Sequence, residues 1–306
     1  MKHAPQLVVV MDDIAHIKFE KDTSLVMLLA AQSRGYQLHY AELADLRLRD
    51  GVAEARLRPL RVHADPKRWF ELGEPQVRPL GSADVILMRK DPPFDTEYIY
   101  STYILERAEL AGALVVNRPR GLRDINEKVY TAWFPELCAP TLITRDIAAM
   151  ADFLAAQGKA VCKPLYGMGG RSIFVLEAGD KNAQVVFETL TDYGQHFAMI
   201  QRYLPDIVTT GDSRVILVDG EVAAVVAGAK GVPRPLNERD REIAAVIGPK
   251  MRELGMLFVG LDVIGGTVTE INVTSPTGVQ ELQRAFGIDV PALLMDAIDR
   301  RLALRS

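Results

Sequence analysis

The first third of the chain alternates between short apolar runs and longer helical segments, and this alternation constrains the fold most. Parallel strands need a long crossover connection, usually a helix, so such alternation is typical of an α/β domain with a parallel sheet. Between two of the apolar runs, Asp50-Gly51 is flanked by alternating apolar residues and predicts a hairpin within residues 46–65. We expect strands over residues 6–12, 37–43, 83–91 and 113–117, and helices over residues 23–36 and 96–112.

The rest of the chain has short strand-like runs separated by glycine turns. Asp219-Gly220 and Gly265-Gly266 each separate two apolar runs and predict hairpins. Residues 237–254 and 291–304 predict helices. Because 306 residues exceed the usual size of one domain, we expect two or three domains.

The composition excludes several classes of protein. A net charge of −4 gives no reason to expect nucleic acid or an anionic membrane as a partner. The apolar run near the N-terminus is too short for a signal or a membrane span. Only Cys138 and Cys162 are present, which argues against a disulfide framework and favours a reducing compartment. We therefore expect a soluble, cytoplasmic protein, with Cys162 as a buried strand residue rather than a nucleophile.

A glycine cluster follows Lys163 at the end of one strand-like run, at Gly167, Met168, Gly169 and Gly170. It is not a Walker loop, whose lysine follows the glycines, and it lacks the spacing of the dinucleotide fingerprint. Either it is a plain β-turn, or its backbone N–H groups cover nucleotide phosphates while Lys163 adds positive charge.

Glu270 and Asn272 lie two residues apart on a predicted strand, so their side chains share one face. A carboxylate beside an amide oxygen suits Mg²⁺. Asp262, on the partner strand, faces away from Glu270 if the Gly265-Gly266 loop has two residues, and lies opposite it if the loop has three and ends at Thr267. If all three side chains bind metal, we expect the three-residue loop. The alternative is a solvated polar face.

Two further segments have the character of binding sites. Residues 201–207 end an apolar strand and offer backbone donors and acceptors to an adenine ring, although an ordinary strand end explains them equally well. Residues 86–95 place two cations and two acids around Pro92-Pro93 at a strand end, where open α/β sheets bind ligands. This segment predicts a carboxylate-binding site, with a solvated turn as the alternative.

Taken together, the segments resemble the bacterial glutathione synthetases, members of the ATP-grasp superfamily. The resemblance covers nearly the whole chain and includes "RKDPPFD", "GLRDINEK", "KPLYGMGGRSIF", "FVGLDVIG" and "TEINVTSPTG". It implies an ATP-grasp fold with an N-terminal parallel-sheet domain over residues 1–122, a lid with the glycine loop over residues 123–200, and a C-terminal domain with the metal-binding hairpin over residues 201–306.

The resemblance also implies roles for individual residues. Lys163 and Arg214 are implied in catalysis, and Asp262, Glu270 and Asn272 in metal binding. The implied substrate contacts are Arg89, Asp91, Ser275 and Thr277. The implied ATP contacts are Lys128, Lys163, Gly167, Met168, Gly169, Gly170, Gln201, Tyr203, Leu204 and Asp212.

The implied reaction joins γ-glutamylcysteine to glycine through an acylphosphate, with ATP as co-substrate and Mg²⁺ or Mn²⁺ as cofactor. The resemblance also suggests a homotetramer. Two alternatives stay open: another ATP-grasp carboxylate–amine ligase, and a non-catalytic ATP-binding protein. A nicotinamide dehydrogenase is disfavoured because the glycine spacing is wrong.

One departure from the family concerns the segment after the Asp219-Gly220 hairpin. The family has a glycine-rich segment with an Arg-x-Asn element there, whereas this chain runs from Val226 almost directly to the turn at residues 233–235. About fifteen to twenty residues are missing, the length of a long functional loop. A true deletion would remove at least one catalytic arginine. The other explanation, which we favour, is a sequence numbered continuously across a disordered loop.

Overall fold

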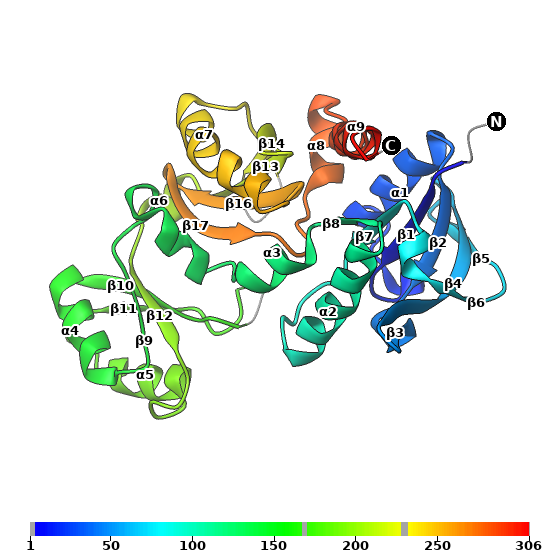
Figure 1. Ribbon diagram of the computed structural model, residues 1–306. Coiled ribbons are helices and arrows are strands. Elements are labelled where there is room, and N and C mark those ends of the chain that lie inside the picture. Colours follow the sequence, from blue (N-terminus) through cyan, green and yellow to red (C-terminus); the bar gives the residue numbers. More distant parts are fainter. Residues whose placement is uncertain (1–3, 167–169, 228–231, 306) are drawn as a thin grey trace.

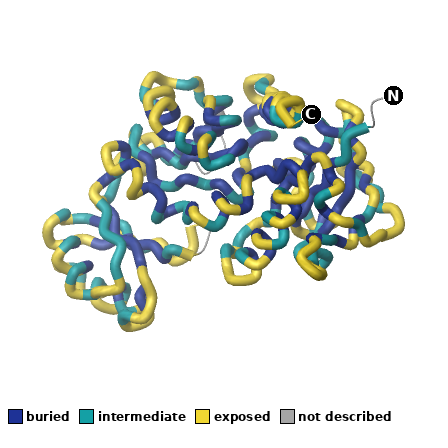
Figure 2. Tube along the Cα trace, in the orientation of Figure 1, coloured by how far each residue is buried: buried dark blue, intermediate teal, exposed yellow. Residues whose placement is uncertain are grey.

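The computed structural model describes residues 4–166, 170–227 and 232–305. These residues form three β-sheets, of eight, four and five strands. The eight-stranded and four-stranded sheets lie at opposite ends of the molecule, with the five-stranded sheet between them (Figure 1). Buried backbone follows the strands of each sheet, and exposed backbone follows the outer helices and loops (Figure 2).

The N-terminal sheet is parallel at its centre, as the alternation of strands and helices predicts. Strands β2 (Gln37–Ala41), β1 (Gln6–Val10), β7 (Val85–Met88) and β8 (Leu114–Val116) run parallel in that order. The antiparallel part consists of β3 (Leu46–Arg49), β4 (Val52–Val62), β5 (Phe70–Leu72) and β6 (Gln76–Pro79). Asp50 and Gly51 both have positive φ in the β3–β4 turn, so the predicted hairpin is confirmed.

Helices cover both faces of this sheet because alternate strand residues point to opposite sides. Val8 and Val10 pack with α2 (Thr96–Leu110), while Leu7 and Val9 pack with α1 (Thr23–Ser33). The final helix, α9 (Val290–Ala303), packs against α1, so the C-terminus closes the core of the N-terminal domain.

The four-stranded sheet, which we call the lid sheet, contains β11 (Phe174–Glu177), β10 (Lys159–Pro164), β12 (Ala198–Arg202) and β9 (Thr141–Thr144) in that order. Helices α4 (Ile147–Gln157) and α5 (Ala183–Thr191) cover one face over a small core that includes Cys162. Val161 and Lys163 alternate with Cys162 along β10, so they point to the opposite face.

The C-terminal sheet contains β15 (Val232–Pro233), β14 (Glu221–Ala227), β13 (Asp212–Val218), β16 (Phe258–Ile264) and β17 (Thr267–Asn272) in that order. The predicted helix between β15 and β16 is α7 (Glu238–Glu253), which begins with a capping box between Asn237 and Asp240. The remaining helical elements are α3 (Pro119–Asp124), α6 (Asp206–Thr209), α8 (Val279–Phe286), η1 (Ile14–His16), η2 (Leu43–Asp45), η3 (Leu80–Ser82), η4 (Val129–Trp133) and η5 (Pro135–Leu137).

The β16–β17 hairpin corrects one prediction. Ile264 pairs with Thr267, so the loop has two residues, Gly265 and Gly266, and not the three that we expected. A β-bulge places Thr269 between two paired residues of β17, and this extra residue shifts the register. Asp262 therefore lies directly opposite Glu270 in spite of the short loop.

Candidate functional site

A cavity of about 820 Å³ lies between the lid sheet, the C-terminal sheet and a loop from the N-terminal domain. This volume is within the usual range for small-molecule sites. Most of the residues predicted for the site line it. They are Asp91, Lys128, Lys163, Gly170, Gln201, Tyr203, Leu204, Asp212, Arg214, Asp262, Glu270, Asn272, Ser275 and Thr277. Gly167, Met168 and Gly169 lie outside the described residues.

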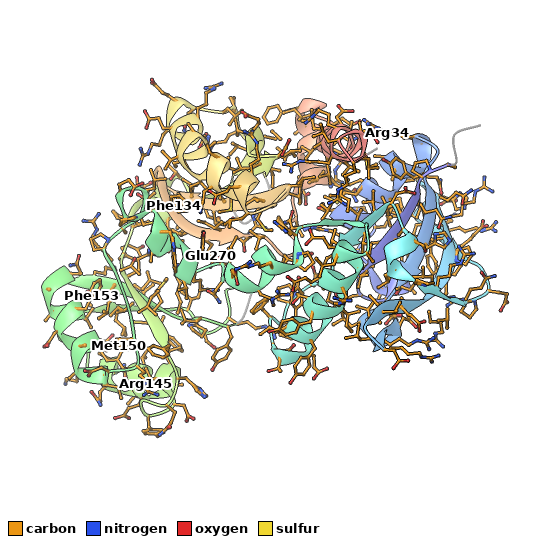
Figure 3. The ribbon with its side chains drawn as sticks, in the orientation of Figure 1. Arg34, Phe134, Arg145, Met150, Phe153 and Glu270 are labelled. Atoms are coloured by element: carbon orange, nitrogen blue, oxygen red, sulfur yellow. The ribbon has the colours of Figure 1, made fainter. Side chains whose placement is uncertain are left out.

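The predicted metal ligands meet on the β16–β17 hairpin. Asp262 lies opposite Glu270, and Asn272 donates Nδ2 to Asp262 Oδ2 at 3.3 Å. Glu270 lies on β17, on the side toward the lid sheet, and lines the cavity between the two sheets (Figure 3). The described residues contain no group of three His, Cys, Asp or Glu side chains that could hold a metal ion. Two carboxylates and one amide oxygen nevertheless fit Mg²⁺, which usually binds through one or two carboxylates and completes its shell with substrate phosphates and water.

Two buried lysines face this hairpin. Lys128 Nζ contacts Glu127 Oε1 at 2.5 Å and lies 3.7 Å from Glu270 Oε1. Burial lowers the pKa of Lys163, the positive charge of Lys128 lowers it further, and the Glu270 carboxylate opposes this change. Burial also raises the pKa of Glu270, against the opposing effect of Lys128. Burial therefore disfavours the charged forms of both Lys163 and Glu270, as is common where a charged ligand binds.

Arg214, on β13, forms an ion pair with Asp262 of this hairpin. Its Nε and Nη2 donate to Asp262 Oδ1 and Oδ2 at 2.7 and 2.8 Å, and its Nη1 donates to Thr277 Oγ1 at 3.3 Å. Burial alone would lower the pKa of Arg214, but the hydrogen bonds and charge of Asp262 raise it. The guanidinium is therefore held charged and fixed against one predicted metal ligand.

The part of the cavity near residues 201–207 has apolar walls. Tyr203 and Leu204 line it together with Ile173, Val175 of β11 and Ile264 of β16. This slot has the chemistry to hold a flat aromatic ring. The sequence reasoning missed Val175, although the alternation of residues along β11 was a signal that could have identified it.

Gln201 lines the cavity, and its side chain contacts both Thr141 and Lys163. Its Nε2 donates to Thr141 Oγ1 at 2.8 Å, and its Oε1 is 3.5 Å from Lys163 Nζ. The side chain therefore helps to orient Lys163.

The predicted substrate residues separate into two groups. Asp91, Ser275 and Thr277 line the cavity, and Ser275 Oγ donates to Asp91. Asp12, which the sequence reasoning missed, accepts from the backbone N–H of Asp91 and pairs with Lys90.

Arg89, in contrast, is buried and is not among the residues that line the cavity. Its Nε donates to Ser24 Oγ at 3.1 Å, and its Nη2 donates to the Pro276 carbonyl at 3.0 Å. Arg89 thus holds the loop at residues 274–278 against the N-terminal domain.

Comparison with known proteins identifies the family. Residues 6–123 match the N-terminal domain of prokaryotic glutathione synthetase, and residues 127–287 match its ATP-grasp domain. This chain belongs to the prokaryotic glutathione synthetase family. It is 51% identical to glutathione synthetase of Shewanella oneidensis, with 97% of this chain and 99% of the relative covered. The corresponding enzyme of Pseudomonas putida is 53% identical, with 98% and 99% covered.

Solved structures that are similar to this member of the glutathione synthetase family show the ATP-grasp fold. The D-cycloserine synthetase DcsG has a TM-score of 0.69 at 16% identity, with 97% of this chain and 99% of that chain covered. D-alanyl-alanine synthetase A of Vibrio cholerae has a TM-score of 0.61 at 11% identity, with 98% and 99% covered. The chain is an ATP-dependent ligase of this fold, as the resemblance implied.

The relatives are longer than this chain in at least one place. The alignments with the Shewanella and Pseudomonas enzymes extend over 312 and 315 residues, more than the 306 residues present here. In this chain, Val226 pairs with Pro233 and Ala227 pairs with Val232, so residues 228–231 alone connect β14 to β15. The intact mass, 33.8 kDa for the present sequence, decides between a true deletion and a longer natural chain.

Proposed function

We propose that this chain joins γ-glutamylcysteine to glycine and converts ATP to ADP and phosphate. The observation that supports this most is the cavity itself. Lys128, Lys163 and Arg214, which can neutralise phosphates, share it with Asp91 and Ser275 at the edge of the N-terminal domain. Nucleotide and acceptor groups would therefore meet in one enclosure.

The first step makes the cysteinyl carboxylate of γ-glutamylcysteine electrophilic. This carboxylate attacks the γ-phosphorus of ATP, so an acylphosphate forms and ADP leaves. Lys128, Lys163 and Arg214 provide fixed positive charge to the phosphate oxygens as negative charge shifts between them. Asp262, Glu270 and Asn272 would hold Mg²⁺, or Mn²⁺ in its place, which supplies further neutralisation of the phosphates when it is bound.

In the second step the glycine amine attacks the acyl carbon, and phosphate leaves as the peptide bond forms. No side-chain nucleophile is required. Water must be excluded, because acylphosphates hydrolyse readily.

Replacement of Cys162 directly tests that this cysteine does not act as a nucleophile. Burial raises its pKa to about 12, so at pH 8 only about one thiol in 10⁴ is ionised. We expect Cys162→Ala to retain kcat within about threefold, with only the modest stability loss of a small cavity. Mass spectrometry after iodoacetamide treatment should show Cys162 alkylated only in unfolded protein. Rapid alkylation of native protein at Cys162 together with inactivation would contradict this.

A cytoplasmic location fits the use of ATP and two free cysteines, Cys138 and Cys162. None of the helices in the described ranges is long and apolar enough to cross a membrane.

We also propose a homotetramer, on the family resemblance alone, which the mass of the native assembly would test.

Another carboxylate–amine ligase is the main alternative, since the nucleotide site does not specify the acceptor. The decisive experiment measures ADP release with Mg-ATP, γ-glutamylcysteine and glycine, and then with each omitted in turn. We expect ADP only when both amino-acid substrates are present, with glutathione formed in equal amount. ADP release with another carboxylate–amine pair would support the alternative. ATP binding without any turnover would indicate a non-catalytic protein and a true loss of the loop near Val226.

A further inference from the structure

The ion pair between Arg214 and Asp262 has a consequence for the order in which ligands bind. The two residues are direct partners across β13 and β16, and both carboxylate oxygens accept from the guanidinium. Asn272 Nδ2 donates to Oδ2 as well. Three donors therefore already use most of the roughly four lone-pair sites that a carboxylate offers.

The backbone around this pair leaves room for the arginine side chain. A Cβ atom added to Gly260 of β16 would lie 3.2 Å from Arg214 Cδ, a tight contact. Gly260 thus lets the arginine stem lie across β16 to reach Asp262. On its other side the guanidinium donates to Thr277. Three segments of the C-terminal domain therefore position this ion pair: β13, β16 and the loop that contains Thr277.

The charges around the hairpin are already matched without a ligand. Lys128, Lys163 and Arg214 are opposed by Glu127, Asp262 and Glu270, so the formal sum of these six is zero. A divalent cation that entered alone would add two positive charges beside a fixed guanidinium. Such an entry is electrostatically unfavourable, since like charges in a partly buried site repel strongly.

We propose that Arg214 occupies Asp262 in the nucleotide-free protein and so competes with the divalent cation for this carboxylate. Arrival of nucleotide phosphates gives the guanidinium a new acceptor, and Asp262 becomes available to the metal. Metal binding is thereby coupled to nucleotide binding through one side chain that has two alternative partners. This inference rests on the proposed function for the identity of the metal ligands.

The test is a titration of nucleotide-free protein with Mn²⁺, in which electron paramagnetic resonance measures the free ion. We expect the Arg214→Met variant to bind Mn²⁺ about tenfold more tightly than the unmodified protein, a typical size for such coupling. Arg214→Lys, which keeps the charge but lacks the two-pronged contact, should fall between them. Asp262→Asn in the Arg214→Met background should abolish the gain.

Arg56→Met is the matched control, because it removes the same charge from an ion pair with Asp45 in the N-terminal domain. It should leave Mn²⁺ affinity unchanged. Equal Mn²⁺ affinity in Arg214→Met, Arg214→Lys and unmodified protein, all folded by circular dichroism, would overturn the proposal. If Arg214→Met does not fold, the Mn²⁺ affinity of Arg214→Lys is compared with that of the unmodified protein. Equal affinities would again overturn the proposal. No amino-acid substrate is used, so failure of the ligase assay and failure of this inference are separate outcomes.

Discussion

Replacement of Glu270 by glutamine is expected to lower kcat by about 10³-fold, a loss typical for one electrostatic contact to the transition state. Glu270 lies opposite Asp262 and 3.7 Å from Lys128 Nζ, at the centre of the cavity's charged wall. Glutamine keeps the shape but removes the negative charge that a divalent cation requires. The measurement is the steady-state rate of ADP release at saturating substrates over a range of Mg²⁺ concentrations.

The loss in the Glu270→Gln variant should not result from unfolding. Because burial raises the pKa of Glu270, the folded protein already disfavours its ionised form, and a neutral side chain of equal size is tolerated. The melting temperature should therefore stay close to that of the unmodified protein. Glu253→Gln is the control, since Glu253 is an exposed partner of Lys250 on α7 and should leave kcat unchanged. A Glu270→Gln variant with more than a tenth of the original kcat would exclude Glu270 from the metal site.

Replacement of Asn117 by alanine is expected to lower the free energy of unfolding by about 3–5 kcal/mol, because it leaves buried backbone groups without partners. Asn117 follows β8 and is 3% exposed. Its Nδ2 donates to the carbonyls of Phe258 and Val273 at 2.7 Å each, and its Oδ1 accepts from Phe258 N–H at 2.9 Å. One side chain thus joins the N-terminal domain to β16 and to the segment that follows β17.

Urea denaturation followed by circular dichroism and by tryptophan fluorescence measures this effect. Agreement of the two probes would justify a two-state treatment in a protein whose described residues form three sheets. Asn182→Ala, at an exposed residue before α5 whose side chain makes no capping hydrogen bond, should change stability by less than about 0.5 kcal/mol. A loss below about 1 kcal/mol for Asn117→Ala would mean that water replaces its hydrogen bonds.

The sequence predicted most of the architecture because its signals are local. Asp50-Gly51 and Asp219-Gly220 fix hairpins through positive φ, and alternation of strands and helices predicts a parallel sheet. The pairing of Asp262 with Glu270 could be anticipated, but the reason that we gave for it was wrong. It depends on a bulge at Thr269, and no periodicity in the sequence distinguishes an extra loop residue from an extra strand residue.

Arg89 shows that the burial of a side chain cannot always be predicted from the sequence around it. Its charged, proline-rich neighbourhood suggested a residue open to ligands, and Asp91 does line the cavity. The acceptor that draws Arg89 into the interior is the carbonyl of Pro276, 187 residues further along the chain. Such a contact depends on how two domains pack, and neither segment alone indicates it.

The loop at residues 274–278 limits how this enzyme could be redesigned. Ser275 contacts Asp91, Pro276 contacts Arg89, and Thr277 contacts Arg214. Under the proposed function, selection for a different acceptor would draw on Ser275, yet Ser275 lies only two residues from Thr277, a partner of Arg214. Acceptor preference and turnover would therefore change together, so new specificities should be sought first at Asp12 and Lys90, which contact Asp91 from the N-terminal domain.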